Sequence, residues 1–167
     1  MTRIFRPAEI ADLEEIMTII ADAVGRMLRE GKQQWDETYP TSQHIAADIR
    51  NGDAYVIESE GRVIAYGAVV FTGEEAYESL QGAWLSDRPY VVVHRMAVAQ
   101  NRQGKGLARI FLESTESLAR SKGIGSFRID TNFDNFPMLH LLDKCGFTYC
   151  GEIRYSGGAR RAYEKLL

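Results

Sequence analysis

Cysteine is scarce in this sequence, and its scarcity excludes two classes of protein. Only two of the 167 residues are cysteines, Cys145 and Cys150. Two cysteines so placed make neither a zinc site nor a disulfide framework. We therefore expect both thiols to be reduced and to lie in the hydrophobic core.

Long apolar runs and an excess of one charge are also absent. No stretch approaches the roughly 18 apolar residues of a membrane-spanning helix, and residues 1–7 contain no apolar signal region. The chain has 20 basic and 23 acidic residues, a formal charge of −3, without the strong basic field of a nucleic-acid-binding protein. We expect a cytoplasmic protein with no membrane or nucleic-acid partner.

Length and hydropathy fit one packed domain over residues 1–167, because 45% of the residues are hydrophobic. Apolar spacing of three and four predicts helices over residues 13–28, 107–122 and 135–144. A short helix that carries Ile45, Ala46 and Ile49 is also predicted, with a break and possible N-cap at residues 40–42 and an end near residues 51–52. Runs rich in β-branched and aromatic residues predict strands at 3–6, 54–58, 62–71, 90–98, 127–130, 147–153 and 161–166. Residues 73–87 give no clear prediction. The order of these elements is that of a mixed α/β fold.

The most informative motif joins the strand at 90–98 to the helix at 107–122. It consists of six consecutive residues: Gln103, Gly104, Lys105, Gly106, Leu107 and Ala108. Glycine accepts positive φ, so successive backbone N–H groups can turn inward at the helix N-terminus and bind phosphate oxygens. Lys105 adds a positive charge. The same pattern also suits a tight connection that binds nothing.

Two familiar nucleotide-binding motifs do not fit this loop. The sequence has no Gly-x-x-x-x-Gly-Lys-Ser/Thr string, and no complete Gly-x-Gly-x-x-Gly followed by an acidic residue. A second segment, residues 135–147, opens a helix with Asn135 and ends it with Lys144, Gly146 and Phe147.

Together these two segments resemble the signatures of the GNAT N-acetyltransferase superfamily. Gln103, Gly106 and Ala108 fill its pattern of Gln or Arg, two residues, Gly, one residue, and Gly or Ala. The resemblance implies a central, mostly antiparallel sheet flanked by helices. It also implies transfer of an acetyl group from acetyl-CoA to an amine of a small molecule or peptide, by direct attack in a ternary complex. No metal is implied.

The resemblance also implies which residues bind acetyl-CoA. The loop residues 103–108 would hold the pyrophosphate, and Asn135 would make a polar contact to CoA. The backbone of Met96, Ala97 and Val98 would pair with the pantetheine arm, and the Met96 backbone would donate toward the thioester oxygen. Structural roles, as a core strand and as a helix N-cap, are compatible with these assignments.

The catalytic residues are less clear from sequence. No Ser or Cys nucleophile has a paired base, and the spacing of His44, His94 and His140 does not suit a metal. His94 is our candidate base; a core or surface role is the alternative. In a flat strand His94 and Arg95 point to opposite faces, unless a bulge intervenes.

One family position departs from its usual residue. Many family members have a Tyr four residues before the Gly of the Gly-Phe pair, where it protonates the departing thiolate. Leu142 occupies that position here. Tyr149, Tyr155 or water are the candidate substitutes.

We expect the acceptor amine to bind near the N-terminal helices and the ends of the central strands. Trp35 and Tyr39 could frame an ammonium group with their rings, although Trp35 could equally close the core. Arg95 could meet a substrate carboxylate, and Asp130 follows a strand; a surface ion pair is the alternative for both.

Three function classes stay open from the sequence. The first is the N-acetyltransferase. The second is an acyl-CoA-binding regulatory module without catalysis, which would bind acetyl-CoA without turnover. The third is a structural or interaction domain that binds no CoA. A homodimer through an exposed closing strand at residues 161–166 is a further prediction by analogy.

Overall fold

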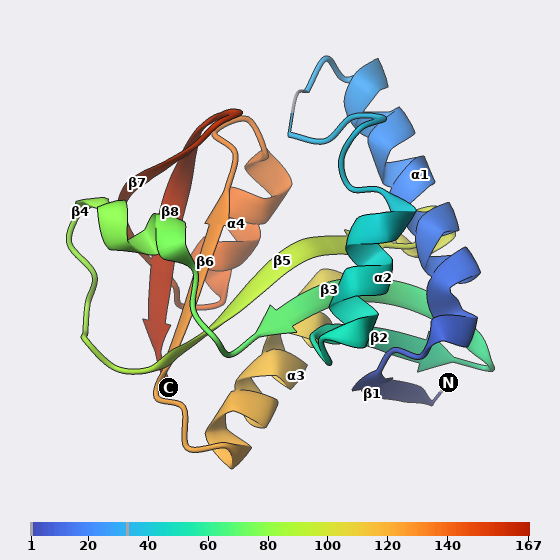
Figure 1. Cartoon of the computed structure of the whole chain (residues 1–167), viewed down its shortest axis with the longest axis horizontal. Coiled ribbons are helices and arrows are strands. Elements are labelled where there is room, and N and C mark those ends of the chain that lie inside the picture. Colours follow the sequence, from blue (N-terminus) through green and yellow to red (C-terminus); the bar gives the residue numbers. More distant parts are fainter. Residues whose placement is uncertain (1, 33) are drawn as a thin grey trace. The chain divides into compact units, whose positions relative to one another are not determined.

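The computed structural model describes residues 2–32 and 34–167. Within them the α-helices are α1 (Leu13–Arg29), α2 (Ser42–Arg50), α3 (Leu107–Ser121) and α4 (Phe136–Lys144) (Figure 1). Short 3-10 turns are η1 (Ile10–Asp12), η2 (Glu75–Ser79) and η3 (Gln100–Arg102). The strands are β1 (Arg3–Pro7), β2 (Ala54–Ser59), β3 (Arg62–Val70), β4 (Gln81–Gly82), β5 (Tyr90–Val98), β6 (Ser126–Thr131), β7 (Thr148–Tyr155) and β8 (Gly158–Leu166).

The strands follow the order β1-β2-β3-β5-β6-β8-β7-β4. The pairs β1–β2, β2–β3, β6–β8, β7–β8 and β4–β7 are antiparallel, and β5–β6 is parallel. The predicted mixed α/β fold with a mostly antiparallel sheet is confirmed. The chain forms two compact units: Met1–Val69 with His94–Ser114, and Val70–Val93 with Thr115–Leu167. The single domain predicted from sequence stays a prediction.

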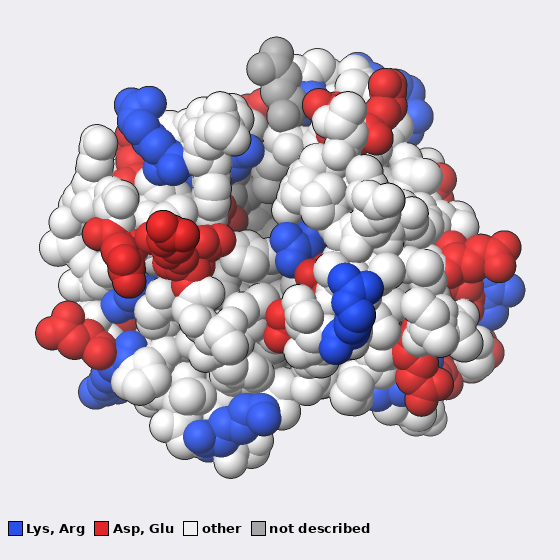
Figure 2. Space-filling view, viewed as in Figure 1, with Lys and Arg blue, Asp and Glu red and all other residues white. Residues whose placement is uncertain are grey.

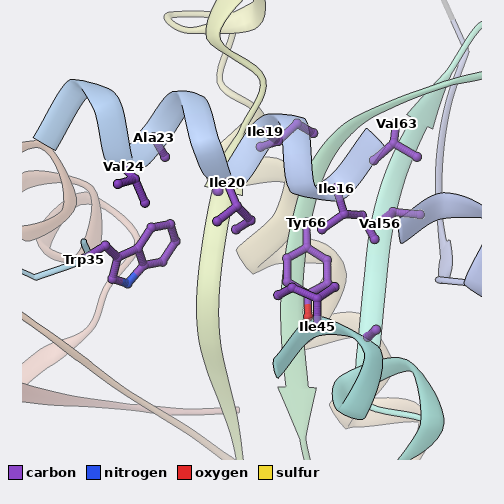
Figure 3. Packing of buried hydrophobic residues seen from close by; sticks show 12 residues of the cluster. Ile16, Ile19, Ile20, Ala23, Val24, Trp35, Ile45, Val56, Val63 and Tyr66 are labelled. Carbon is purple, nitrogen blue, oxygen red and sulfur yellow. The ribbon is translucent and has the colours of Figure 1, made fainter. Parts of the chain in front are cut away.

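The first unit is a sheet with helices on both faces. α1 and α2 pack on one face through an apolar cluster that includes Ile16, Ile45 and Tyr66 (Figure 3). Residues next to each other in a strand point to opposite faces, and Gly67, which follows Tyr66, contacts Phe111 of α3. The hairpin between β2 and β3 turns at Glu60 and Gly61, both at positive φ (53° and 76°).

The second unit is built on β6, β8, β7 and β4, with α4 beside the sheet (Figure 1). β8 pairs with β6 along one edge and with β7 along the other. The prediction of an exposed closing strand at residues 161–166 is therefore wrong, because residues 161–164 of β8 are paired with β6 on one side and with β7 on the other. A homodimer would need another surface.

Most elements lie where the sequence predicts them. Thr41 caps α2 by accepting a hydrogen bond from the His44 N–H, and Asn135 caps α4 by accepting from the Met138 N–H. Residues 73–87, which gave no prediction, contain η2 and β4. Cys145 and Cys150 are buried, as expected, and neither is in a disulfide within the described part of the chain. None of the helices in the described part of the chain is long and apolar enough to cross a membrane.

Charged groups are mixed over the face drawn in Figure 2. Blue and red side chains occur in small groups separated by uncharged surface, and acidic ones gather over η2. The described residues hold no cluster of three or more His, Cys, Asp or Glu that could bind a metal.

Candidate active site

The glycine loop leads directly into the first turn of α3. Gly104 and Gly106 have φ of 76° and 73°, a conformation that favours glycine, and a Cβ at either would meet no atom within 4 Å. The loop glycines and Lys105 are exposed, and the first intrahelical hydrogen bond runs from the Ile110 N–H to the Gly106 carbonyl. The first N–H groups of a helix have no intrahelical acceptor. This open loop therefore presents backbone donors and a cation to solvent, as a phosphate site requires.

Gln103 ties the loop to the strand before it. Its side-chain Nε2 donates to the Val98 carbonyl over 3.4 Å, and its backbone N–H reaches the Gln100 carbonyl of η3 at the same distance. The first position of the motif thus fixes the path from β5 into the loop.

The second half of β5 contains residues 96–98, for which we predicted backbone contacts to the pantetheine arm. The parallel ladder between β5 and β6 pairs Tyr90 to Val92 with Ser126 to Arg128, and its register ends there. Ala97 is buried in the core of the first unit, whereas Met96 and Val98 are partly buried. Residues 96–98 therefore lie outside the β5–β6 ladder.

β5 is not flat at Arg95. The φ of Arg95 is 55°, in the left-handed region that few non-glycine residues adopt. This conformation interrupts the alternation of side chains in the way that a bulge does. The flat-strand restriction on His94 and Arg95 is therefore lifted.

A two-point ion pair holds the Arg95 side chain. Its Nη2 donates to Asp48 Oδ1 over 2.7 Å and its Nε donates to Asp48 Oδ2 over 2.8 Å. A third donor, Nη1, reaches the Tyr39 Oη at 3.0 Å. Burial disfavours the charged guanidinium, but the hydrogen bonds and charges of Asp48 and Tyr39 together outweigh it and raise the pKa of Arg95.

Asp48 also accepts a hydrogen bond from the phenol of Tyr66. Asp48 is only 5% exposed and Tyr66 is fully buried. Burial, together with the nearby Asp48 carboxylate, raises the pKa of Tyr66. Tyr66 thus stays neutral and donates. Sequence reasoning missed both residues, since Tyr66 lies inside an apolar run and Asp48 on a helix with mixed polarity.

His94 is partly buried, and it interacts electrostatically with a second carboxylate, that of Asp53. Burial raises the pKa of Asp53, and the Asp48 carboxylate adds to the shift, while Arg95 and His94 oppose it. Asp53 is joined to α2 by its backbone N–H, which donates to the Asp48 carbonyl over 2.9 Å. The candidate base thus interacts electrostatically with Asp53, which the sequence motif did not reveal.

The two aromatic residues on the segment after α1, Trp35 and Tyr39, differ in their exposure to solvent. Trp35 is 6% exposed and packs beside Ile20 and Val24 in the core (Figure 3). This placement favours its role as a structural plug. Tyr39 is 36% exposed, accepts from Arg95 and contacts the His44 ring at 4.8 Å between centroids. Tyr39 is the better placed of the two for a substrate.

In the second unit, Asp130 lies among phenols. It accepts from Tyr77 Oη over 2.7 Å and from Tyr155 Oη over 3.1 Å, and Tyr155 also reaches Glu74 at 3.3 Å. Burial and the Asp130 charge raise the pKa of both phenols. Asn135, also in this unit, donates its side-chain N–H to Thr131 Oγ1 over 3.2 Å.

Comparison with known proteins decides which family this chain belongs to. The sequence profile of the acetyltransferase (GNAT) family matches residues 20–147, more than half of the chain. The chain belongs to the GNAT acetyltransferase family. A GNAT-family acetyltransferase structure from Streptococcus agalactiae 2603 is 35% identical, covers 99% of this chain and 95% of that one, and has a TM-score of 0.89.

Other relatives are more distant. A GNAT-family structure from Listeria monocytogenes 4b F2365 is 20% identical over 99% of this chain and 95% of that one; its TM-score of 0.79 shows likeness of fold. Streptothricin acetyltransferase from Escherichia coli is 27% identical over 116 residues, which are 70% of this chain and 65% of that protein. The protein of the same name from Streptomyces lavendulae matches 36% of this chain and 32% of its own length at 28% identity. The aligned part thus spans less than two thirds of either curated relative.

The GNAT tyrosine position is apolar in the structure as in the sequence. Leu142 is fully buried in α4. Of the candidate substitutes, Tyr149 is 45% exposed and lies against Arg161 and Tyr163, whereas the Tyr155 phenol is bound to two carboxylates. A phenol whose proton points at a carboxylate is poorly set to protonate a thiolate.

Proposed function

We propose that this GNAT protein is an N-acetyltransferase that moves the acetyl group of acetyl-CoA to a primary amine of a small molecule or peptide. The observation that carries the proposal is the open glycine loop, residues 103–108, with left-handed Gly104 and Gly106 at the start of α3. Membership of the GNAT family also supports acetyl transfer from acetyl-CoA to an amine. A loop shaped only for a tight connection has no need of two open, exposed glycines beside a lysine.

The residues of the chain fit acetyl-CoA. Loop N–H groups and Lys105 would hold the pyrophosphate, the backbone of residues 96–98 would pair with the pantetheine arm, and Asn135 would contribute a polar contact. Bound acetyl-CoA would supply an activated thioester. The chain would then need only to position the amine, accept its proton and donate hydrogen bonds to the developing oxyanion.

We assign the role of general base, which accepts the amine proton, to the His94 imidazole. The hydrogen bond to the developing oxyanion is assigned to the Met96 backbone N–H. The amine nitrogen forms the C–N bond as the C–S bond breaks, and the amine proton passes to His94. Because a thiolate leaves readily at neutral pH, the chain can work with Leu142 in place of a phenol. Water would supply the last proton.

The acceptor is proposed to be a cationic small-molecule amine. The two curated relatives are named for streptothricin, so streptothricin is the first acceptor to test. Tyr39 and Asp130 are our candidates for its ammonium groups. Trp35 is a further aromatic candidate, and Arg95 is the candidate for a carboxylate. We further propose a cytoplasmic location, in keeping with two buried cysteines that are not joined in a disulfide in the described part of the chain.

The first experiment is calorimetric titration of the protein with acetyl-CoA. Gly106→Glu should abolish binding, because it adds a bulky negative side chain to the phosphate loop. Gly123→Glu is the matched control, since Gly123 has the same φ of 73° and the same open surroundings but lies beyond the far end of α3. Loss of binding in both variants, or in neither, would contradict the assigned loop.

Turnover separates the enzyme from its main alternative, an acyl-CoA-binding regulatory module without catalysis. Leu142 in the usual tyrosine position favours that alternative. Thiol release from acetyl-CoA in the presence of streptothricin, and then of a panel of amines and peptides, would establish the enzyme. Tight binding with no release on any acceptor would establish the silent module.

A further inference from the structure

Arg95 has a left-handed backbone conformation at the point of β5 where the candidate catalytic groups must be correctly oriented. It lies between His94, the candidate base, and Met96, whose N–H is the candidate oxyanion donor. A left-handed residue reorients the peptide planes on both of its sides. The conformation at residue 95 therefore sets the directions of the His94 side chain and of the Met96 N–H.

The side chain of Arg95 is anchored by a residue distant in sequence. Asp48 lies on α2, and its carboxylate meets the guanidinium at two points, 2.7 and 2.8 Å. Paired parallel hydrogen bonds of this kind fix orientation as well as distance. Both side chains are largely buried, with 17% of Arg95 and 8% of Asp48 exposed.

Asp48 is itself held in place by a hydrogen bond from Tyr66. The Tyr66 phenol donates to its Oδ2, the oxygen that also accepts from Arg95 Nε. Tyr66 is fully buried in the cluster beneath α1 and α2 (Figure 3). The chain Tyr66–Asp48–Arg95 thus joins the rigid core of the first unit to the irregular point of β5.

We propose that Asp48 is a positioning residue, which holds Arg95 left-handed and thereby aims the backbone of residues 96–98 and the His94 side chain. This inference rests on the proposed function for the roles of those groups. Asp48 acts through Arg95. The guanidinium edge that would bind a substrate carboxylate at two points is already occupied by Asp48, which favours an anchoring role for Arg95.

The central test compares Asp48→Asn with Asp12→Asn. Asp12 is a matched control in the same unit: it is 9% exposed and accepts from Arg6 at two points, 2.8 and 3.0 Å, but it lies at η1. Asp48→Asn should lower kcat by about tenfold to a hundredfold, with the acceptor KM changed by less than about threefold, since misplaced groups lose rate rather than binding. Asp12→Asn should keep kcat.

A second readout does not depend on activity. The Ala99 N–H donates to the Ile64 carbonyl over 2.9 Å, at the end of the segment that Arg95 directs. Amide hydrogen exchange over residues 94–99 should become about tenfold faster in Asp48→Asn and stay unchanged in Asp12→Asn. Exchange over residues 126–131 should be unchanged in both variants.

Rescue distinguishes a positioning role from a general loss of stability. Glycine adopts positive φ without an anchor, and Arg95→Gly removes the buried charge that Asp48→Asn leaves unpaired. The double variant should therefore regain part of the lost kcat. If Asp48→Asn does not fold, Tyr66→Phe, which leaves the ion pair intact, should show the same effects at a smaller size.

The outcomes separate this inference from the proposed function. Unchanged exchange in Asp48→Asn, equal rate losses in the two Asn variants, or no rescue by Arg95→Gly would overturn the positioning role. Absence of turnover by the wild type would contradict the proposed enzyme, and hydrogen exchange would then decide alone whether Asp48 holds this segment.

Discussion

The ring of Phe111 on α3 lies against the backbone of Gly67 on β3. A Cβ at position 67 would lie 2.6 Å from the ring Cζ and 2.7 Å from Cε1, closer than real Cβ contacts. Phe111 is fully buried and meets Phe5 edge-on, with 5.3 Å between ring centroids. The glycine therefore allows the helix to approach the sheet.

Gly67→Ala should destabilise the protein by about 1–3 kcal/mol, because the added methyl group overpacks a core position. Gly25→Ala is the control: it lies on α1, where alanine is the better helix former by about 1 kcal/mol, and its Cβ meets only a flexible Arg29 side-chain atom at 3.3 Å. Urea unfolding measures both. A neutral Gly67→Ala would mean that α3 can shift at little cost.

Asp12 should make stability depend on pH in acid. Its hydrogen bonds with Arg6 lower the pKa of Asp12 despite partial burial, and the Glu9 N–H adds to the shift. Because the pKa of Asp12 is lower in the folded protein than in the unfolded chain, the ion pair stabilises the fold fully at a pH above the usual aspartate pKa of about 4. This stabilisation is lost as the pH falls through the lower pKa of the folded state. Asp12→Asn should cost about 1–3 kcal/mol at neutral pH. Thermal unfolding as a function of pH should show this difference shrinking toward acid; a constant difference would contradict the linkage.

Lys105 should strengthen acetyl-CoA binding by its charge alone. Lys105→Met is expected to raise the Kd about three- to tenfold and to weaken its dependence on salt, since an exposed cation interacts through screened attraction. Lys122→Met, at the far end of α3, is the control and should bind as the wild type does. Equal affinity for Lys105→Met would place the phosphates away from this side chain.

His94→Ala tests the candidate base. Loss of a general base lowers the rate by about 10²–10⁴-fold, and a histidine base also imposes a fall in rate toward acid, where imidazole is protonated. The variant should lose both the rate and that acid limb with a good acceptor. His140→Ala, on the exposed side of α4, should keep both. A normal rate and pH profile for His94→Ala would remove His94 from the mechanism.

The sequence predicted those parts of the fold that local physics controls. α1 and α3 show apolar spacing over several turns, and Asn135 sits where a capping side chain is favoured. The glycine loop was predictable for the same reason. Its positive φ angles and the helix start that follows depend only on residues adjacent in the sequence.

Other parts depend on contacts that no local pattern contains. Asp48 and Arg95 are 47 residues apart, and each alone resembles a surface charge. Trp35 was ambiguous because an aromatic ring serves a core or a binding site equally well in sequence. The position of β8 inside its sheet follows from pairing with β6 and β7, and strand propensity gives no information on order.

That position of β8 has a consequence during synthesis. Translation proceeds from the N-terminus at about 5–20 residues per second, so β6 and β7 leave the ribosome before the strand that lies between them. β6 waits with one edge unpaired until β8 is made, whereas β7 joins β8 through the short turn at residues 156–157. The second unit therefore completes its sheet late, because the strand that joins β6 to β7 comes after both in the chain.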